Sequence, residues 1–330
     1  MLSRVLRLHP DVLSFSEFFA LLVTRDGRPA LIFDTERDGP EFWELLTQPH
    51  RLGEAIIDGG HIEELAAEPV RARFGPNAPR LSYLLPWVTD RADALYDHLA
   101  ATVPTWPRRP MLDQYRALFT SMAEFLGRRV VVERSGYSLV FLHKLLKFDE
   151  AKIVHMHRDG PACAVSMSKN AIFRAMMLGQ EARRQVRHST DRADLRRRFQ
   201  GLITPPYDID AIMEYDLPLW RFGELWSSAI TGGAERLRDL PPHRWTQLRY
   251  EDVVTDPRTA LTGLAEFIGI SAPAQWLDAA DSFIDAGAAT SRPATLDPAV
   301  RARLEEACGP GRDAVAELDR ISSGSSSPAV

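Results

Sequence analysis

Short runs of β-branched residues alternate along this chain with segments of helical periodicity. Such runs, bounded by polar or glycine-containing stretches, are typical of buried strands. Two are clear, Arg129–Glu133 and Lys152–Met156, a third is weaker, Trp245–Tyr250, and two more are candidates, Val12–Ser16 and Ala30–Phe33. Strands that alternate with helices predict an α/β fold with a largely parallel sheet. Ligands of such sheets bind at the carboxyl ends of the strands.

Apolar residues recur at three- and four-residue spacing between these runs. The spacing predicts amphipathic helices over Leu112–Leu126 and Thr259–Ile268. Each is followed by a glycine, the residue that most often ends a helix. A further helix is predicted over Pro298–Cys308, with Asp297 as its N-cap and Gly309 as its stop.

The 330 residues suffice for one large domain or two small ones. No internal repeat is visible. The only low-complexity stretch covers residues 322–330, and its serine-rich composition cannot bury enough apolar surface to become ordered. We therefore predict a single domain over residues 1–321 and a disordered tail over residues 322–330.

Charge and composition exclude several classes of protein. The formal net charge of -5 argues against non-specific nucleic-acid binding, which needs a basic surface. The arginine-rich stretch 183–198 also contains acidic residues and is interpreted as a solvated helix face. No segment has the length and hydropathy of a membrane span or the apolar core of a signal peptide, so a cytoplasmic location is expected.

The cysteines and histidines do not form a recognisable metal site. Two cysteines, Cys163 and Cys308, provide neither a disulfide framework nor a cysteine-based zinc site. His155 and His157 would share one face of a strand, but no third ligand lies nearby in the sequence. A catalytic metal is therefore not expected.

The segment from Lys152 to Asn170 carries the most specific chemistry. A strand leads into His-Arg-Asp-Gly-Pro and then into a helix that contains Ser166. Pro161 suits the first turn of that helix, where free N–H groups favour an anion. An arginine at the strand end, Arg158, together with a hydroxyl suits a dianionic phosphate. The alternative is a solvated strand end followed by an ordinary helical serine.

A strand, then arginine, then serine eight positions later resembles the motif with which sulfotransferases bind the 3′-phosphate of their donor PAPS (3′-phosphoadenosine 5′-phosphosulfate). Arg158 and Ser166 match that motif in residue type and spacing. The chain departs from the usual pattern after Asp159, where Gly-Pro-Ala stands in place of Pro-Arg-Asp. The resemblance implies that Arg158 and Ser166 bind the 3′-phosphate.

A second stretch, Leu248–Ile270, resembles the family's RYEDL…DP…FLG signature. Arg249–Asp252 stand in the expected order, followed by an Asp-Pro pair and by Phe267–Gly269. Taken alone, the stretch predicts a strand, a turn and a capped helix. Its role is interpreted as structural, and its carboxylates are not assigned to catalysis.

A third stretch, Val131–Leu146, resembles the strand, loop and helix that precede the phosphate motif in bacterial sulfotransferases. Glu133, Arg134 and Ser135 are expected at the carboxyl end of the strand. The functional interpretation is that this strand end, with Arg134 and Ser135 as the named ligand contacts beside Glu133, meets the acceptor or the phosphosulfate group. The alternative is that these residues only begin a capped helix.

The N-terminal stretch Leu8–Glu17 resembles the segment after the first phosphate loop in sulfotransferases related to the tyrosylprotein enzymes. In those relatives a glutamate at the position of Glu17 acts as the base that takes the acceptor's proton. The resemblance implies this role for Glu17, and the alternative is an ordinary acidic residue near a helix start. Arg292, in a late loop, is a further candidate for a nucleotide contact.

The resemblance also implies a loop rich in glycine and serine or threonine that holds the 5′-phosphosulfate. No such loop occurs in this sequence, and Met1 aligns with about the place where the loop would end. The expected fold is therefore a P-loop-NTPase-like sulfotransferase fold, a mainly parallel sheet flanked by helices, whose first strand and phosphate loop are missing. Two explanations are open. The start codon was assigned too late, which the intact downstream motifs favour, or the gene is a degenerate copy.

Together the motifs predict a sulfotransferase that moves a sulfuryl group from PAPS, its co-substrate, to a hydroxyl or amine acceptor without a metal. The acceptor is expected to be a small molecule, a glycan or a lipid; neither nucleic acid nor stable membrane insertion is expected. The alternative is a catalytically compromised nucleotide-binding or scaffold protein on the same fold. A phosphotransferase is disfavoured, because the sequence has no Walker-type lysine and no magnesium-binding aspartate cluster. The sequence defines neither the acceptor nor the oligomeric state.

Overall fold

The computed structural model describes most of the chain. The described residues are 1–19, 24–25, 28–29, 33–49, 51–59, 67–75, 77–136, 138–188, 192–284 and 296–324.

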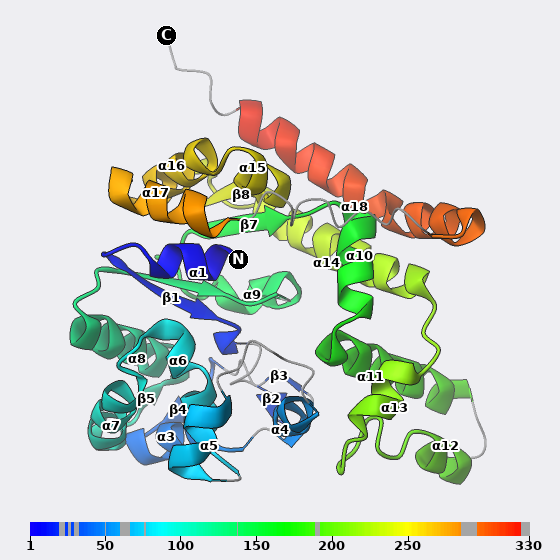
Figure 1. Cartoon of the computed structure of the whole chain (residues 1–330), viewed down its shortest axis with the longest axis horizontal. Coiled ribbons are helices and arrows are strands. Elements are labelled where there is room, and N and C mark those ends of the chain that lie inside the picture. Colours follow the sequence, from blue (N-terminus) through cyan, green and yellow to red (C-terminus); the bar gives the residue numbers. More distant parts are fainter. Residues whose placement is uncertain are drawn as a thin grey trace.

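Two parallel strand pairs lie among the helices (Figure 1). One pair joins β1 (Val12–Ser16) to β6 (Val130–Arg134), and the other joins β7 (Ile153–His157) to β8 (Trp245–Arg249). These four strands begin and end within one residue of the predicted ones, so the prediction of an α/β fold with parallel strands is confirmed. Of the fifth candidate, Ala30–Phe33, residues 30–32 lie outside the described residues.

Two short antiparallel pairs and many helices complete the described elements. The short strands are β2 (Thr24–Arg25) with β3 (Arg28–Pro29), and β4 (Glu36–Arg37) with β5 (Arg109–Pro110). The helices are α1 (Leu2–Arg7), α3 (Gly39–Thr47), α4 (Arg51–Asp58), α5 (Ala67–Phe74), α6 (Leu85–Val88), α7 (Ala92–Thr102), α8 (Met111–Leu126), α9 (Leu142–Leu145), α10 (Gly160–Ser168), α11 (Ala171–His188), α12 (Arg192–Arg198), α13 (Ile209–Glu214), α14 (Leu219–Arg238), α15 (Tyr250–Thr255), α16 (Pro257–Ile268), α17 (Ala274–Phe283) and α18 (Pro298–Gly324).

Strand β1 is buried on both faces because its side chains alternate between two apolar clusters. Val12 packs into a cluster that includes residues of α1, α16 and α17. Leu13 and Phe15 point the other way, into an aromatic cluster with Tyr115 of α8. A strand covered on both faces is typical of parallel sheets.

The helices predicted from periodicity are confirmed. Helix α8 ends at Gly127 and α16 ends at Gly269, as predicted. Both glycines have the left-handed backbone conformation, with φ values of 64° and 83°. A residue with a β-carbon adopts this conformation only at a cost, which is why glycine ends these helices.

The C-terminal helix corrects one prediction. It was expected to stop at Gly309, but α18 continues to Gly324 with Pro310 inside it. The predicted tail therefore starts three residues too early, since residues 322–324 belong to the helix; residues 325–330 lie outside the described residues. The single domain over residues 1–321 stays a prediction.

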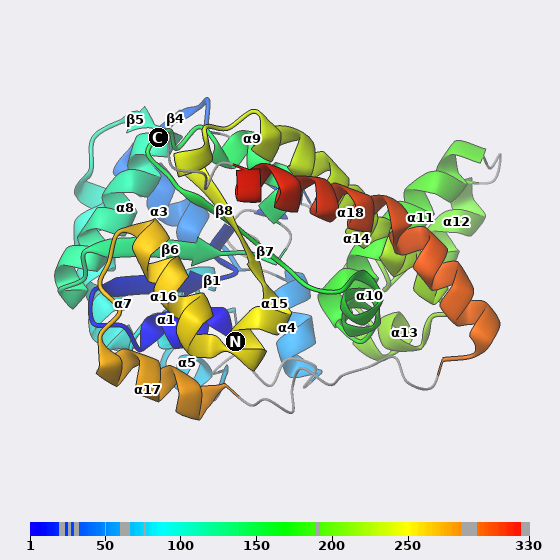
Figure 2. The ribbon, with the colours of Figure 1, turned by 90° about the horizontal axis from the view of Figure 1, so that it is seen from above.

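The continuation of α18 has a tertiary cause. The helix packs along α14 (Figures 1 and 2). Next to Pro310, the Ser227 hydroxyl of α14 donates a hydrogen bond to the Ala307 carbonyl (2.7 Å) and accepts one from the Gly311 N–H (3.1 Å). The hydroxyl bridges two groups that an unbroken helix would pair directly, so backbone groups near the proline stay satisfied.

Candidate active site

Glu17 and Arg134 meet at the carboxyl ends of β1 and β6. The parallel register places Ser16 opposite Arg134, and the Glu17 N–H continues the ladder with a 2.6 Å hydrogen bond to the Arg134 carbonyl. The Arg134 guanidinium forms an ion pair with the Glu17 carboxylate. Two residues that are far apart in sequence therefore form one charged cluster, at the edge where ligands of parallel sheets bind.

The loop after β6 adds a third group to this cluster. The Gly136 N–H lies 3.1 Å from each carboxylate oxygen of Glu17. The side chains of Glu17 and Arg134 keep 33% and 40% of their exposure, so solvent reaches both. The cluster is thus ordered by its hydrogen bonds and remains accessible to a small molecule.

Glu17 has a backbone conformation that is rare for its residue type. Its φ is 59°, in the left-handed region. A residue other than glycine keeps this conformation only where surrounding bonds impose it, and such residues are common at functional sites.

Glu133 lies beside the Glu17 cluster and has a perturbed acidity. It is half-buried as a whole residue, and burial of its carboxyl group, assisted by the negative charge of Glu17, raises the pKa of Glu133 to about 7. Hydrogen bonds from the Ser135 hydroxyl and the Phe19 N–H act in the opposite direction. A carboxyl group that titrates near neutral pH in an accessible cluster is typical of a functional site.

Ser135 was predicted to contact the phosphosulfate or the acceptor. The structure places it as a buried residue whose hydroxyl donates to Glu133. The Ser135 carbonyl accepts a hydrogen bond from the Ser138 hydroxyl (2.9 Å). Contact of Ser135 with a ligand stays a prediction. Arg292 lies outside the described residues.

Arg158 directly follows the last residue of β7. Two residues of the stretch Arg249–Asp252 contact Arg158 or its neighbour Asp159. Its guanidinium lies over the ring of Tyr250, 4.6 Å from the centroid. The Glu251 carboxylate accepts the N–H of Asp159 at 3.1 Å. The two central residues of the Arg-Tyr-Glu-Asp stretch therefore contact the Arg158 segment, which agrees with a structural role for that stretch.

The start of α10 is partly occupied by its own capping residue. The Asp159 carboxylate accepts the N–H of Ala162 at 3.1 Å. The prediction of free N–H groups at this helix start is therefore wrong for Ala162, because a side-chain cap takes that donor. Ser166 is exposed and lies further along α10. No hydrogen bond joins Ser166 to Arg158 among the residues that the structure describes.

Packing explains the glycine at position 160, where the chain departs from the family pattern. A β-carbon on Gly160 would lie 2.8 Å from the Trp226 ring of α14. Real side chains do not tolerate such an approach, so only glycine lets α10 begin this close to α14.

His155 and His157 share a face of β7 as predicted, with ring centroids 5.2 Å apart. Burial, assisted by the neighbouring imidazole, lowers the pKa of His155 to about 4, so this ring is neutral at physiological pH. Within the described residues, no group of three or more histidine, cysteine, aspartate or glutamate side chains could hold a metal ion.

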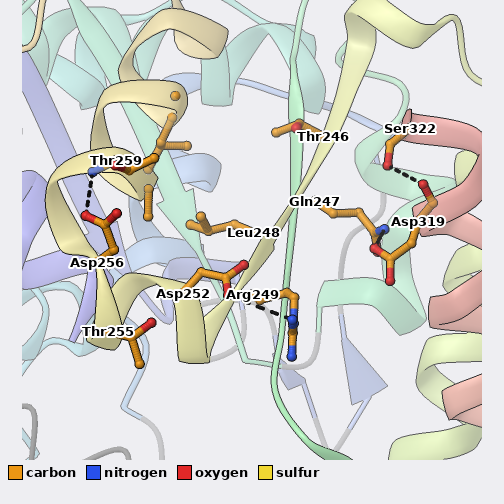
Figure 3. A pocket seen from close by; sticks show the side chains of 13 residues that line it. Thr246, Gln247, Leu248, Arg249, Asp252, Thr255, Asp256, Thr259, Asp319 and Ser322 are labelled. Atoms are coloured by element: carbon orange, nitrogen blue, oxygen red, sulfur yellow. Dashed lines mark hydrogen bonds and ion pairs between the residues drawn. The ribbon is translucent and has the colours of Figure 1, made fainter. Parts of the chain in front are cut away.

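A separate cavity of about 570 Å³ lies along β8, between α15 and α16 on one side and the end of α18 on the other (Figure 3). Gln247 and Asp319 meet across it in a 2.6 Å hydrogen bond. None of the predicted site residues lines this cavity. The charged cluster at β1 and β6 is therefore the better candidate for an active site.

The sequence did not single out Gly136, which the structure places in contact with Glu17, and it did not predict that Tyr250 lies against Arg158. The contacts of Gly136 and Tyr250 depend on the pairing of segments that are distant in sequence, and no local pattern shows them.

Comparison with known proteins identifies the family of this chain. A family model described as a sulfotransferase domain matches residues 84–284, more than half of the chain. The chain belongs to the sulfotransferase domain family. The α/β fold class that the sequence predicts is the fold class of this family. The matched residues include Arg134, Arg158 and Ser166 and begin after Glu17.

Two solved structures are similar to this chain. One is the sulfotransferase domain from the olefin synthase of Synechococcus PCC 7002, with 18% identity over 93% of this chain and 89% of that chain and a TM-score of 0.45. The other is the sulfotransferase domain from the curacin biosynthetic pathway, with 16% identity over 92% of this chain and 91% of that chain and a TM-score of 0.45. No curated protein matches the chain. No helix in the described part of the chain is long and apolar enough to span a membrane.

Proposed function

We propose that this protein transfers a sulfuryl group from PAPS to a hydroxyl or amine group of a small-molecule, glycan or lipid acceptor. The observation that carries the proposal is the cluster of Glu17, Arg134 and Gly136 in a chain of the sulfotransferase domain family. The cluster joins a carboxylate, which can take a proton, to a guanidinium, which can stabilise negative charge.

In the proposed reaction, the acceptor's oxygen or nitrogen attacks the sulfur of PAPS as the bond from sulfur to the bridging phosphate oxygen breaks. The acceptor's proton passes to the Glu17 carboxylate. Adenosine 3′,5′-bisphosphate (PAP) leaves with the electron pair of the broken bond. While the group is being transferred, Arg134 stabilises the charge that develops on it.

We assign the 3′-phosphate of PAPS to Arg158 and Ser166. The Arg158 guanidinium lies over the Tyr250 ring, 4.6 Å from the centroid, and this contact limits where the side chain can lie. A guanidinium and a hydroxyl fit a phosphate dianion in charge and in donor number. The exposure of Ser166 supports the assignment, because an exposed hydroxyl is available to a ligand.

A second candidate function is nucleotide binding without catalysis. The observation that favours it is the engagement of the Glu17 carboxylate, which already receives the Arg134 guanidinium and the Gly136 N–H. These bonds give the carboxylate a structural role that does not require catalysis. The two functions differ in one outcome, since only the transferase converts bound PAPS to PAP in the presence of an acceptor.

Binding of PAP tests the proposal without knowledge of the acceptor. We expect calorimetric titration to show PAP binding to the wild-type protein. Arg158→Ala should weaken the affinity by about 2–5 kcal/mol, on the order of 30- to 5000-fold, as for loss of one partner of a desolvated charge pair.

The matched control for this titration is Arg129→Ala. Arg129 is an arginine with 75% side-chain exposure that precedes the amino end of β6, opposite the candidate site. PAP affinity should be the same in this variant and in the wild type. Unchanged PAP affinity in Arg158→Ala would remove the assignment of the phosphate site.

A further inference from the structure

Two glutamates at the ends of β1 and β6, Glu17 and Glu133, each accept a hydrogen bond from the segment that follows the other strand. Glu17, which follows β1, accepts the N–H of Gly136 in the loop after β6. Glu133, near the end of β6, accepts the N–H of Phe19, which lies two residues after Glu17, at 3.2 Å. Each carboxylate therefore restrains the segment that leaves the neighbouring strand.

The backbone on both sides of the turn at Glu17 is hydrogen-bonded to residues of β6. Before the turn, the Glu17 N–H bonds to the Arg134 carbonyl of β6. After the turn, the Phe19 N–H bonds to the Glu133 carboxyl, also on β6. Between these two bonds, Glu17 has its left-handed φ of 59°. A turn clamped at both ends can keep a conformation that an unrestrained glutamate would leave.

We propose that Glu133 is a positioning residue for Glu17, because its carboxyl group holds the Phe19 N–H and thereby keeps the left-handed turn that presents the Glu17 carboxylate. The inference rests on the proposed function, in which Glu17 takes the acceptor's proton. Glu133 itself does not meet the acceptor in this scheme. It acts by fixing where Glu17 lies relative to Arg134 and Gly136.

The chemistry of the Glu133 contacts predicts which substitutions preserve the turn. One carboxyl oxygen of Glu133, Oε1, accepts both the Phe19 N–H and the Ser135 hydroxyl. The side-chain amide of glutamine offers an oxygen at the same distance from the backbone and can accept both bonds. Alanine removes the acceptor, and aspartate keeps it on a side chain shorter by one methylene.

Amide hydrogen exchange measured by NMR tests the inference in the wild-type protein, in three variants of Glu133 and in one control variant. We expect the Phe19 N–H to exchange about tenfold faster or more in Glu133→Ala, and Glu133→Gln to restore the wild-type rate. The decisive amide is that of Gly136, which bonds to Glu17 and not to Glu133. It should also exchange faster in Glu133→Ala, because Glu17 leaves its place when the turn is released.

Glu133→Asp provides the same test if Glu133→Ala does not fold, and it should behave like Glu133→Ala. Glu124→Gln, which changes an exposed glutamate of α8, is the control and should leave both amides unchanged. Faster exchange at Phe19 with unchanged exchange at Gly136 would overturn the inference, since Glu17 would then keep its place without Glu133. Unchanged exchange at both amides would overturn it as well.

Failure of the proposed function would give a different result. PAP binding, which we assign to β7 and α10, should be the same in Glu133→Ala as in the wild type. A wild-type protein that does not bind PAP would contradict the proposed function, whereas the exchange rates of Phe19 and Gly136 would still decide whether Glu133 positions Glu17.

Discussion

Two glutamates at the ends of neighbouring strands show at the residue scale how surroundings decide what a carboxyl group can do. Glu17 is accessible and paired with Arg134, whereas the Glu133 carboxyl is enclosed and titrates near neutral pH. Arg158, on the other strand pair, is stacked on Tyr250. In each case the residue type was visible in the sequence, but its state depends on neighbours that arrive from other segments.

Glu133 should make the stability of the protein fall as the pH rises. Its pKa is raised from the ordinary 4.5 to about 7 in the folded protein, so the folded state binds this proton more tightly than the unfolded state does. The resulting stability is fully present below pH 4.5 and is lost as the pH rises through 7. Across that window the loss is no more than about 3 kcal/mol.

Urea unfolding at pH 5 and pH 8 measures this contribution. From pH 5 to pH 8 the unfolding free energy should fall less, or rise more, in Glu133→Gln than in the wild type, and Glu124→Gln should follow the wild type. The other titrating groups, His155 among them, contribute equally to all three proteins and cancel in the comparison. An identical pH dependence in Glu133→Gln and the wild type would show that the Glu133 pKa is ordinary.

Tyr250 should contribute to PAP affinity through Arg158. Its ring supports the guanidinium at 4.6 Å, and a cation–π contact at a partly exposed site is worth about 0.5–2 kcal/mol. Tyr250→Ala is therefore expected to weaken PAP binding by roughly 2- to 30-fold in calorimetric titration. Tyr250→Phe keeps the ring and should bind PAP as the wild type does; equal weakening in both variants would point to the hydroxyl instead.

At the scale of elements, α14 is the helix against which both α10 and α18 pack. Its Trp226 ring lies between Gly160 of α10 and Gly311 of α18, where added β-carbons would come within 2.8 Å and 2.4 Å of it. Both glycines are needed for close approach. The same helix supplies Ser227, whose hydroxyl bridges α18 beside Pro310. The position of α10, and with it the Arg158 segment, thus depends on α14.

Loss of the Ser227 hydroxyl should destabilise the contact of α14 with α18. Ser227 is buried, and its removal leaves the Ala307 carbonyl and the Gly311 N–H without their bridging partner. We expect Ser227→Ala to lower the free energy of unfolding by about 1–3 kcal/mol in urea titration. Ser228→Ala, at an exposed position of the same helix, is the control. A negligible loss of unfolding free energy in Ser227→Ala would mean that the Ala307 carbonyl and the Gly311 N–H of α18 pair without the Ser227 hydroxyl.

At the scale of the whole molecule, helix α18 belongs to the core although it lies beyond the residues that match the family model. The match ends at residue 284, and α18 begins at Pro298. Leu304, Cys308 and Leu318 are fully buried in the cluster around α14. The helix therefore covers apolar surface that would otherwise face water.

Removal of α18 should therefore abolish cooperative folding. Fully burying a leucine side chain is worth about 1.5–3 kcal/mol, so Leu304 and Leu318 together contribute about 3–6 kcal/mol, which is comparable with the lower part of the roughly 5–15 kcal/mol by which a typical domain is stable. We expect a chain that stops at residue 296 to aggregate or to lose its thermal unfolding transition in calorimetry. A chain that stops at Gly324 is the control and should keep the wild-type transition. A cooperative transition in the shorter chain would show that α18 is peripheral.

Part of the fold and of the candidate site could be predicted from the sequence. The four strands and the helix ends at Gly127 and Gly269 follow local rules, because β-branched runs, amphipathic spacing and left-handed glycines act on residues a few positions apart. Local patterns placed Arg134 and Arg158 at strand ends, where the structure has them. The roles of Ser135, Ser166 and Arg292 in binding remain predictions.

The sequence by itself therefore determined four strands, the helix ends at Gly127 and Gly269 and the identity of the charged groups, since these depend on short-range sterics and on periodic burial. Only the tertiary structure decided three contacts. Glu17 pairs with Arg134, the Glu133 carboxyl accepts the Phe19 N–H, and the Ser227 hydroxyl of α14 bonds to α18 beside Pro310. The physical reason is that each of these bonds joins segments at least 80 positions apart. Strand register and helix packing bring them together, and neither is a property of any local stretch.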